Sequence, residues 1–173
     1  MAIRAVAPGV ALVVVVALLT LGLATRGEGQ TPAHLKGLQA VKIVVEDLDE
    51  ETRAEGIAAR AVEDQVLVIL RSKAPQLRYD PSVIPYLYVN INLLSSSVGY
   101  AGSVRLELNR PVEILVGVHR VWQEPRERIP TIVPVWRASY VIQGPRGNAP
   151  GHLRKTLDLL MERFLADYFK ANP

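Results

Sequence analysis

The 173-residue chain contains no cysteine, and this absence excludes several kinds of site at once. Thiolate zinc centres, dithiol redox chemistry and cysteine nucleophiles all need a side chain that the sequence does not have. The lipid-carrying cysteine that anchors bacterial lipoproteins is excluded for the same reason. Any membrane tether must therefore be a segment of the polypeptide itself.

The signatures of common enzymes are missing as well. The sequence has no glycine-rich phosphate loop, no H-E-x-x-H motif, no G-x-S-x-G motif and no S-x-x-K motif. Its three histidines, His34, His119 and His152, lie far apart, and we interpret each as a solvated side chain rather than a ligand or base. We therefore expect no catalytic residue, no metal ligand and no cofactor, and we predict that the protein is not an enzyme.

A strong excess of one charge is also lacking. The formal net charge is only +3, and it is unevenly distributed. Residues 41–70 carry eight acids against three bases, whereas residues 71–155 carry twelve bases against five acids. This indicates one positive end, which is too weak a signal for nucleic-acid binding. Residues 87–92 superficially resemble an RNA-contacting strand, but the second, aromatic motif is missing, and we predict no nucleic-acid partner.

What the sequence does contain is an apolar N-terminal segment. Residues 10–24 carry no charge, follow Arg4, and end with the small residues Gly22 and Ala24 that signal peptidase prefers. Counting from Ala5 gives 20 uncharged residues, which is long enough for an uncleaved anchor. Both interpretations predict export across the cytoplasmic membrane, with the domain periplasmic or anchored on the outer side of that membrane.

This segment divides the chain into three parts. We predict that residues 1–24 are a signal peptide or an N-terminal membrane anchor. Residues 25–38 are small, polar and rich in glycine and proline, which is typical of a flexible leader. Residues 39–173 are predicted to form one domain, since their length and apolar content suffice for a single core.

The first half of this domain predicts one strand and one helix. Residues 41–45 form a short β-branched run that is typical of a strand. The acidic stretch at residues 46–51 is typical of a helix N-terminus, whereas a calcium loop would need alternating ligands and a central glycine. We expect the helix to continue to Lys73, to be weakened by Gly56 and to end before Pro75.

The second half predicts three strands and a helix. Residues 86–93 alternate between apolar and polar side chains, and residues 104–108 and 131–143 show the same period of two. Pro134 has no N–H, so the last strand should lie at an edge of the sheet or be bulged at that point. Residues 152–170 carry apolar side chains at helical spacing and predict an amphipathic helix.

These elements follow one another in the order β-α-β-β-β-α. We predict an α+β fold in which a four-stranded, mainly antiparallel sheet carries two helices on one face and leaves the other face open. This layout is similar to that of the lipopolysaccharide-assembly lipoproteins, which carry their lipid on a cysteine that this chain lacks. The resemblance implies a role in assembly of the cell envelope.

The alternation also predicts which side chains lie on the open face. Most are tyrosine, asparagine or arginine, which combine contact area with hydrogen bonding and suit protein interfaces. The residues that we predict to bind a partner are Tyr86, Tyr88, Asn90, Asn92, Arg105 and Arg137, with Glu107, Asn109 and Ser139 beside them. The alternative is a merely solvated face, which most open antiparallel sheets have.

A second candidate contact is the connection at residues 119–130. It groups Arg120, Trp122, Arg126 and Arg128, and a tryptophan beside arginines suits an anionic lipid headgroup or a protein partner. The alternative is that Trp122 packs against the edge of the sheet.

Three functional hypotheses follow from these observations. The first, which we favour, is a non-catalytic exported envelope protein that acts as a binding or assembly factor, with another envelope protein or a membrane complex as its partner. The second is an accessory subunit anchored in the membrane beside a larger complex. The third is an enzyme with an unrecognised site, which would need a deep pocket that holds an acid of raised pKa.

Overall fold

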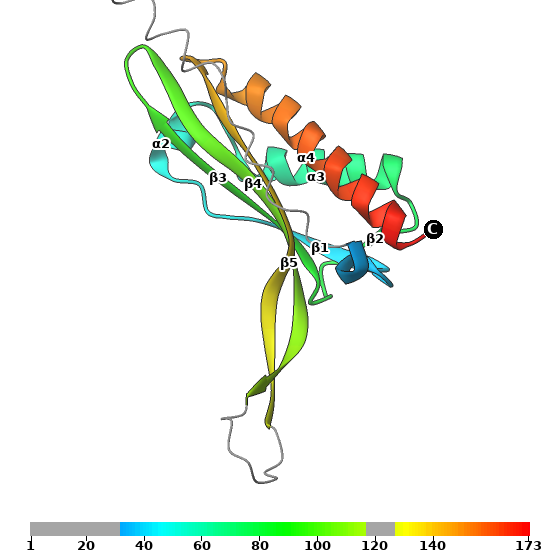
Figure 1. Cartoon of the computed structure of the whole chain (residues 1–173). Coiled ribbons are helices and arrows are strands. Elements are labelled where there is room, and N and C mark those ends of the chain that lie inside the picture. Colours follow the sequence, from blue (N-terminus) through cyan, green and yellow to red (C-terminus); the bar gives the residue numbers. More distant parts are fainter. Residues whose placement is uncertain (1–31, 117–126) are drawn as a thin grey trace, which may run out of the picture.

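In the computed structural model, the structure describes residues 32–116 and 127–173, without the side chains of residues 32, 114–116, 127 and 128. These residues form one sheet with helices on one of its faces (Figure 1). In chain order the elements are η1 (Pro32–Leu35), β1 (Ala40–Val45), α2 (Glu50–Ala54), α3 (Ala59–Lys73), β2 (Arg78–Tyr79), β3 (Tyr86–Ser95), β4 (Gly99–Val116), β5 (Glu127–Pro145) and α4 (Ala149–Ala171).

The sheet has five strands in the order β2-β1-β3-β4-β5. β1 runs parallel to β2 and β3, whereas β3, β4 and β5 form an antiparallel meander. The predicted mixed fold is confirmed, but the sheet has one strand more than predicted. The additional strand, β2, contains only two residues, which is too short to show a hydrophobic period.

β5 is the outer strand on one side of the sheet, as Pro134 predicted. The pairing also slips beside this proline, since Leu108 pairs with Trp136 and Asn109 pairs with Pro134. Val135 is left without a pairing partner of its own, so the strand is both an edge and bulged. Both features are explained by the N–H group that proline lacks.

The expected helix over residues 46–73 is divided in two. Gly56 has a φ of +83°, a backbone conformation that glycine adopts at little cost, and it separates α2 from α3. Asp49 caps α2 by accepting a hydrogen bond of 2.6 Å from the N–H of Thr52. The acidic stretch therefore does begin a helix, but one of only five residues.

The core lies between the sheet and helices α3 and α4, which cover the same face (Figure 1). Leu87 and Val89 of β3 and Leu106 of β4 are fully buried there, as the alternation predicted. Phe164 of α4 meets Trp136 of β5 edge to face, with ring centroids 5.2 Å apart. Burial of each such side chain contributes about 1.5–3 kcal/mol.

The last residues of the predicted leader belong to this core. Leu35 and Leu38 are buried, and the hydroxyl of Tyr168 donates a hydrogen bond to the carbonyl of Leu38 (3.2 Å). The side chain of Asn172 accepts from the N–H of Gly37 (2.7 Å) and donates to the carbonyl of Leu35 (3.0 Å). Residues 32–38 are thus held against the C-terminal end of α4.

Beyond the main sheet, β4 and β5 continue as a two-stranded arm (Figure 1, bottom). β3 pairs with β4 no further than Asn109, whereas the β4–β5 pairing runs on to Val116 and Glu127. Arg110 supports the base of the arm by donating to the carbonyl of His34 (2.7 Å).

The predicted export segment, residues 1–24, lies outside the described residues. Within the part of the chain that the structure describes, no helix has both the length and the apolar character needed to cross a membrane.

Candidate functional site

The register of β3, β4 and β5 brings the predicted binding residues together on the face opposite α3 and α4. Tyr88, Glu107 and Arg137 form one row across the three strands, and Asn90, Arg105 and Ser139 form the next. The open face therefore includes Tyr86, Tyr88, Asn90, Asn92, Arg105, Glu107, Asn109, Arg137 and Ser139. None of the described helices covers it.

Glu107 is the electrostatic centre of the open face. Its Oε1 atom lies 2.8 Å from Nε of Arg137 and 3.6 Å from Nη1 of Arg105. The residue is only 8% exposed. This oxygen makes no hydrogen bond, so the attraction to the two guanidinium groups is coulombic. Glu46 supplies a second carboxylate beside Tyr88, so the two arginines of this network are balanced by two acids, and the half-exposed guanidinium of Arg137 is the charge that reaches solvent.

The asparagines extend this network along β3. The side-chain oxygen of Asn90 accepts from Nη2 of Arg105 (3.1 Å) and from Nδ2 of Asn92 (2.7 Å). Asn90 is buried, whereas Asn92 is exposed. The network therefore fixes the orientation of Arg105 and presents one exposed amide to solvent or to a partner.

Two tyrosines lie at the other end of the open face. The rings of Tyr86 and Tyr88 meet edge to face with centroids 6.4 Å apart, and both are half-buried. Burial raises the pKa of the Tyr88 hydroxyl above its usual value, and the nearby carboxylates of Glu46 and Glu107 raise it further. Both rings thus offer rigid, partly exposed surface, and the Tyr88 hydroxyl is neutral at neutral pH.

The open face changes character toward the β3–β4 turn. Leu94, Val98 and Val141 are 74%, 83% and 80% exposed. An open hollow of about 670 Å³ lies here, and none of its nine lining residues is charged; they are Leu94, Ser96, Val98, Gly99, Tyr100, Ala101, Gln143, Gly144 and Pro145. We did not predict this apolar end, although consecutive apolar residues at 93–94 and 140–142 are a signal, since one of each group must face outward.

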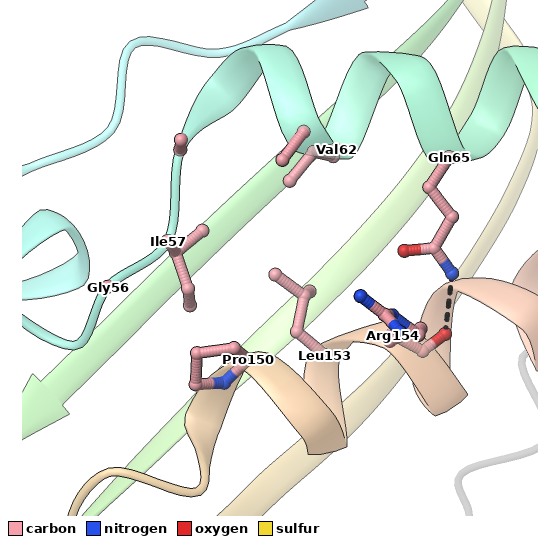
Figure 2. A pocket seen from close by; sticks show the side chains of 9 residues that line it. Gly56, Ile57, Val62, Gln65, Pro150, Leu153 and Arg154 are labelled. Atoms are coloured by element: carbon pink, nitrogen blue, oxygen red, sulfur yellow. Dashed lines mark hydrogen bonds between the residues drawn. The ribbon is translucent and has the colours of Figure 1, made fainter.

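A separate cavity of about 240 Å³ opens between the N-terminal parts of α3 and α4. Figure 2 shows Ile57, Val62 and Leu153 around this space, with Gln65 and Arg154 to one side. The amide of Gln65 donates to the carbonyl of Arg154 (2.9 Å), which links the two helices. No acid or histidine is among the nine residues that line the cavity, so it offers shape and apolar contact rather than acid–base chemistry.

A polar cluster lies on the helix side of the sheet, near the β3–β4 turn. The buried carboxylate of Glu55 accepts from Oγ of Ser95 (2.9 Å) and from the N–H of Gly147 (3.2 Å). The Tyr100 hydroxyl lies 2.5 Å from Nδ1 of His152. Burial raises the pKa of Tyr100, and the charge of Glu55 adds to the effect. His152 is half-buried and paired, so interpreting it as a solvated side chain was wrong.

The second predicted contact falls largely outside the described residues. Arg120, Trp122 and Arg126 all lie outside them, and Arg128 is on β5 with a side chain that is not described. Among residues 32–116 and 127–173, no group of acids and histidines is arranged to hold a metal ion.

Comparison with known proteins identified no relative of this chain. No protein-family model, no curated protein sequence and no solved structure matches the chain. Function must therefore be inferred from the open face and its surroundings.

Proposed function

We propose that the chain is a non-catalytic protein of the cell envelope that binds a partner protein with the open face of its sheet, as a binding or assembly factor. The observation that carries the proposal is the gathering of two tyrosines, two asparagines and two arginines around Glu107 on a face that no described helix covers. Tyrosine and arginine are among the residue types that dominate binding energy at protein interfaces.

The surroundings of the open face favour a protein partner. A nucleic acid would require many cations along one track, whereas Arg105 and Arg137 share this network with two carboxylates, Glu107 and Glu46. The exposed Leu94, Val98 and Val141 add an apolar, uncharged area beside the polar one. A mixed surface of this kind, with a polar network beside apolar side chains, resembles the anatomy of protein interfaces.

The compartment follows from the N-terminal segment. Residues 10–24 support export, so the partner is another envelope protein or a membrane complex. If residues 1–24 are retained, the same chain is an anchored accessory subunit. The intact mass of the native protein from fractionated cells separates the two, because cleavage after Ala24 would leave a chain that starts at Thr25.

Substitution of the open face tests the binding proposal. Tyr88→Ala and Arg137→Ala should each weaken capture of the partner by about 2 kcal/mol, or roughly 30-fold in Kd, because truncation of such residues removes area and charge together. The matched controls are Val68→Ala and Lys155→Ala, which remove exposed side chains from α3 and α4.

The measurement is in-cell crosslinking of the full chain followed by identification of crosslinked proteins, with circular dichroism to verify the fold. The proposal is supported if one protein is lost from both open-face variants and kept in both controls. Equal capture by all four folded variants would contradict it.

A further inference from the structure

The outer edge of β5 is unevenly protected. The hydrogen-bond pattern of the sheet shows which backbone groups of β5 point outward. In antiparallel strands, successive residues bond alternately to the neighbour on one side and on the other. The N–H of Ser96 donates to the carbonyl of Gly99 (2.8 Å), so Gly99 bonds toward β3. The other odd-numbered residues of β4 down to Asn109 then also bond toward β3, and the even-numbered ones bond toward β5.

The β5 residues opposite those odd-numbered positions therefore direct their N–H and C=O groups away from the sheet. They are Arg137, Ser139, Val141 and Gln143, whose partners on β4 are residues 107, 105, 103 and 101. Among the described residues β5 pairs with β4 alone, so these eight backbone groups are unpaired there.

The prolines of β5 follow the same alternation. Pro145 pairs with Gly99, Pro134 with Asn109 and Pro130 with Glu113, so each occupies an outward-facing position. Proline at such a position removes an outward N–H and prevents another strand from pairing there. Proline thus blocks the edge at 130, 134 and 145. Residues 135–144, between Pro134 and Pro145, contain no proline and are called the open stretch of β5.

Side chains at the open stretch indicate what fits it. Its outward-facing residues also lie on the open face, where Arg137 is half exposed and Val141 is 80% exposed. A second copy of the chain pairing here would bring only Arg137, Ser139, Val141 and Gln143, which include no acid to meet the half-exposed guanidinium of Arg137. An extended segment of another protein can meet both side chains, if it carries an acid opposite Arg137 and an apolar residue opposite Val141.

We propose that the partner adds a strand to β5 between Pro134 and Pro145, with an acidic residue opposite Arg137 and an apolar residue four positions away, opposite Val141. This inference rests on the proposed function and specifies how the partner is recognised. Main-chain hydrogen bonds contribute affinity, and the alternate side chains next to Arg137 and Val141 contribute specificity.

Synthetic peptides test the strand directly. The probe is acetyl-Lys-Thr-Val-Thr-Thr-Val-Glu-Thr-Lys-amide, which in antiparallel pairing places its first valine opposite Val141 and its glutamate opposite Arg137; the reversed sequence tests parallel pairing. One control peptide carries lysine in place of glutamate. A second is N-methylated at the residue opposite Ser139, which removes a ladder N–H and keeps every side chain.

Titration of the ¹⁵N-labelled full chain measures binding and its location. One of the two probes should shift the amide signals of residues 135–144, and each control should bind at least tenfold more weakly. Absence of binding by both probes would overturn the inference, and so would equal binding of the N-methylated peptide.

A variant pair separates this inference from the proposed function. Ser139→Pro blocks the edge at a position where no hydrogen bond to β4 is lost, and Ser139→Ala keeps the N–H as its control. In the crosslinking experiment, Ser139→Pro should lose the partner and Ser139→Ala should keep it. If Tyr88→Ala loses the partner while Ser139→Pro keeps it, the open face binds without an added strand and only this inference fails. If Ser139→Pro instead abolishes a dimer seen on gel filtration, the occupant is a second copy, and the inference is overturned.

Discussion

Replacing Glu107 by glutamine tests the electrostatic centre of the open face. The change keeps the volume of the side chain and removes the charge that Arg105 and Arg137 share, at 3.6 Å and 2.8 Å from Oε1. The two guanidinium groups are then left facing each other across a neutral amide. We expect the variant to fold and to be less stable than the parent protein.

The magnitude follows from the exposure of the charges. Two unit charges about 4 Å apart attract by about 1 kcal/mol in water and about 4 kcal/mol near a protein surface of lower effective dielectric constant. The side chains of Arg105 and Arg137 are 40% and 50% exposed, so solvent screens both pairs strongly. We therefore expect a loss of about 1–2 kcal/mol for both contacts together, which lowers Tm by about 3–8 °C in a domain of this size.

Urea denaturation with a double-mutant cycle measures this effect. The cycle compares Glu107→Gln, Arg137→Gln and the double variant, and its coupling free energy should be about 0.5–1 kcal/mol. The coupling should fall when sodium chloride is raised to about 1 M, because salt screens partly exposed charges. A coupling indistinguishable from zero, with unchanged m-values, would show that Glu107 and Arg137 do not interact and would refute the reasoning.

Three further predictions concern the rest of the fold. Gly144→Ala should lower the free energy of unfolding in urea by about 1–2 kcal/mol, because a Cβ there would lie 2.9 Å from the His152 ring and displace its contact with Tyr100. Gly151→Ala, whose Cβ would have nothing within 4 Å, should be neutral or stabilising. Asp49→Ala should lower the free energy of unfolding by about 1 kcal/mol at neutral pH, because it removes the N-cap of α2. Hydrogen bonds from Thr52 lower the pKa of Asp49 below 3.8 in the folded state. The stability difference between parent and variant should therefore shrink as the pH falls through 3.8 toward the folded-state pKa. Burial raises the pKa of Tyr100 and Tyr168 above 10.0 in the folded state, so stability should be complete below pH 10 and fall above it, and Tyr100→Phe should reduce that fall; an identical alkaline profile for the variant would contradict this.

The sequence alone was enough to predict which side chains lie on each face of the sheet, because the alternation of apolar and polar residues is a local property. Residues 86–93 repeat with a period of two, so burial of Leu87 and Val89 places Tyr88 and Asn90 on the other side whichever strands lie beside them. Pro134 marked an edge strand for a similarly local reason, since proline has no N–H to donate. Other local signals were incomplete. Gly56 was recognised as a weak point, but its positive φ and the resulting division into two helices were not predicted.

Only the tertiary structure decided which side chains meet. Glu107 meets Arg137 because β4 pairs with β5 in one particular register, and that pairing joins residues that are distant in the chain. The cluster of Glu55, Tyr100 and His152 likewise depends on three separate elements packing at one end of the sheet. The contacts of residues 32–38 depend on the end of α4, which lies 130 and 135 positions away for Leu38 and Gly37.

The sequence by itself thus determined the absence of thiol chemistry, the apolar N-terminal segment and the two faces of the strands, since each is written in composition or in a local period. The tertiary structure decided the ion pairs of the open face, the apolar end beside it and the open stretch of β5. These depend on register, and register is set by long-range packing that no local pattern contains.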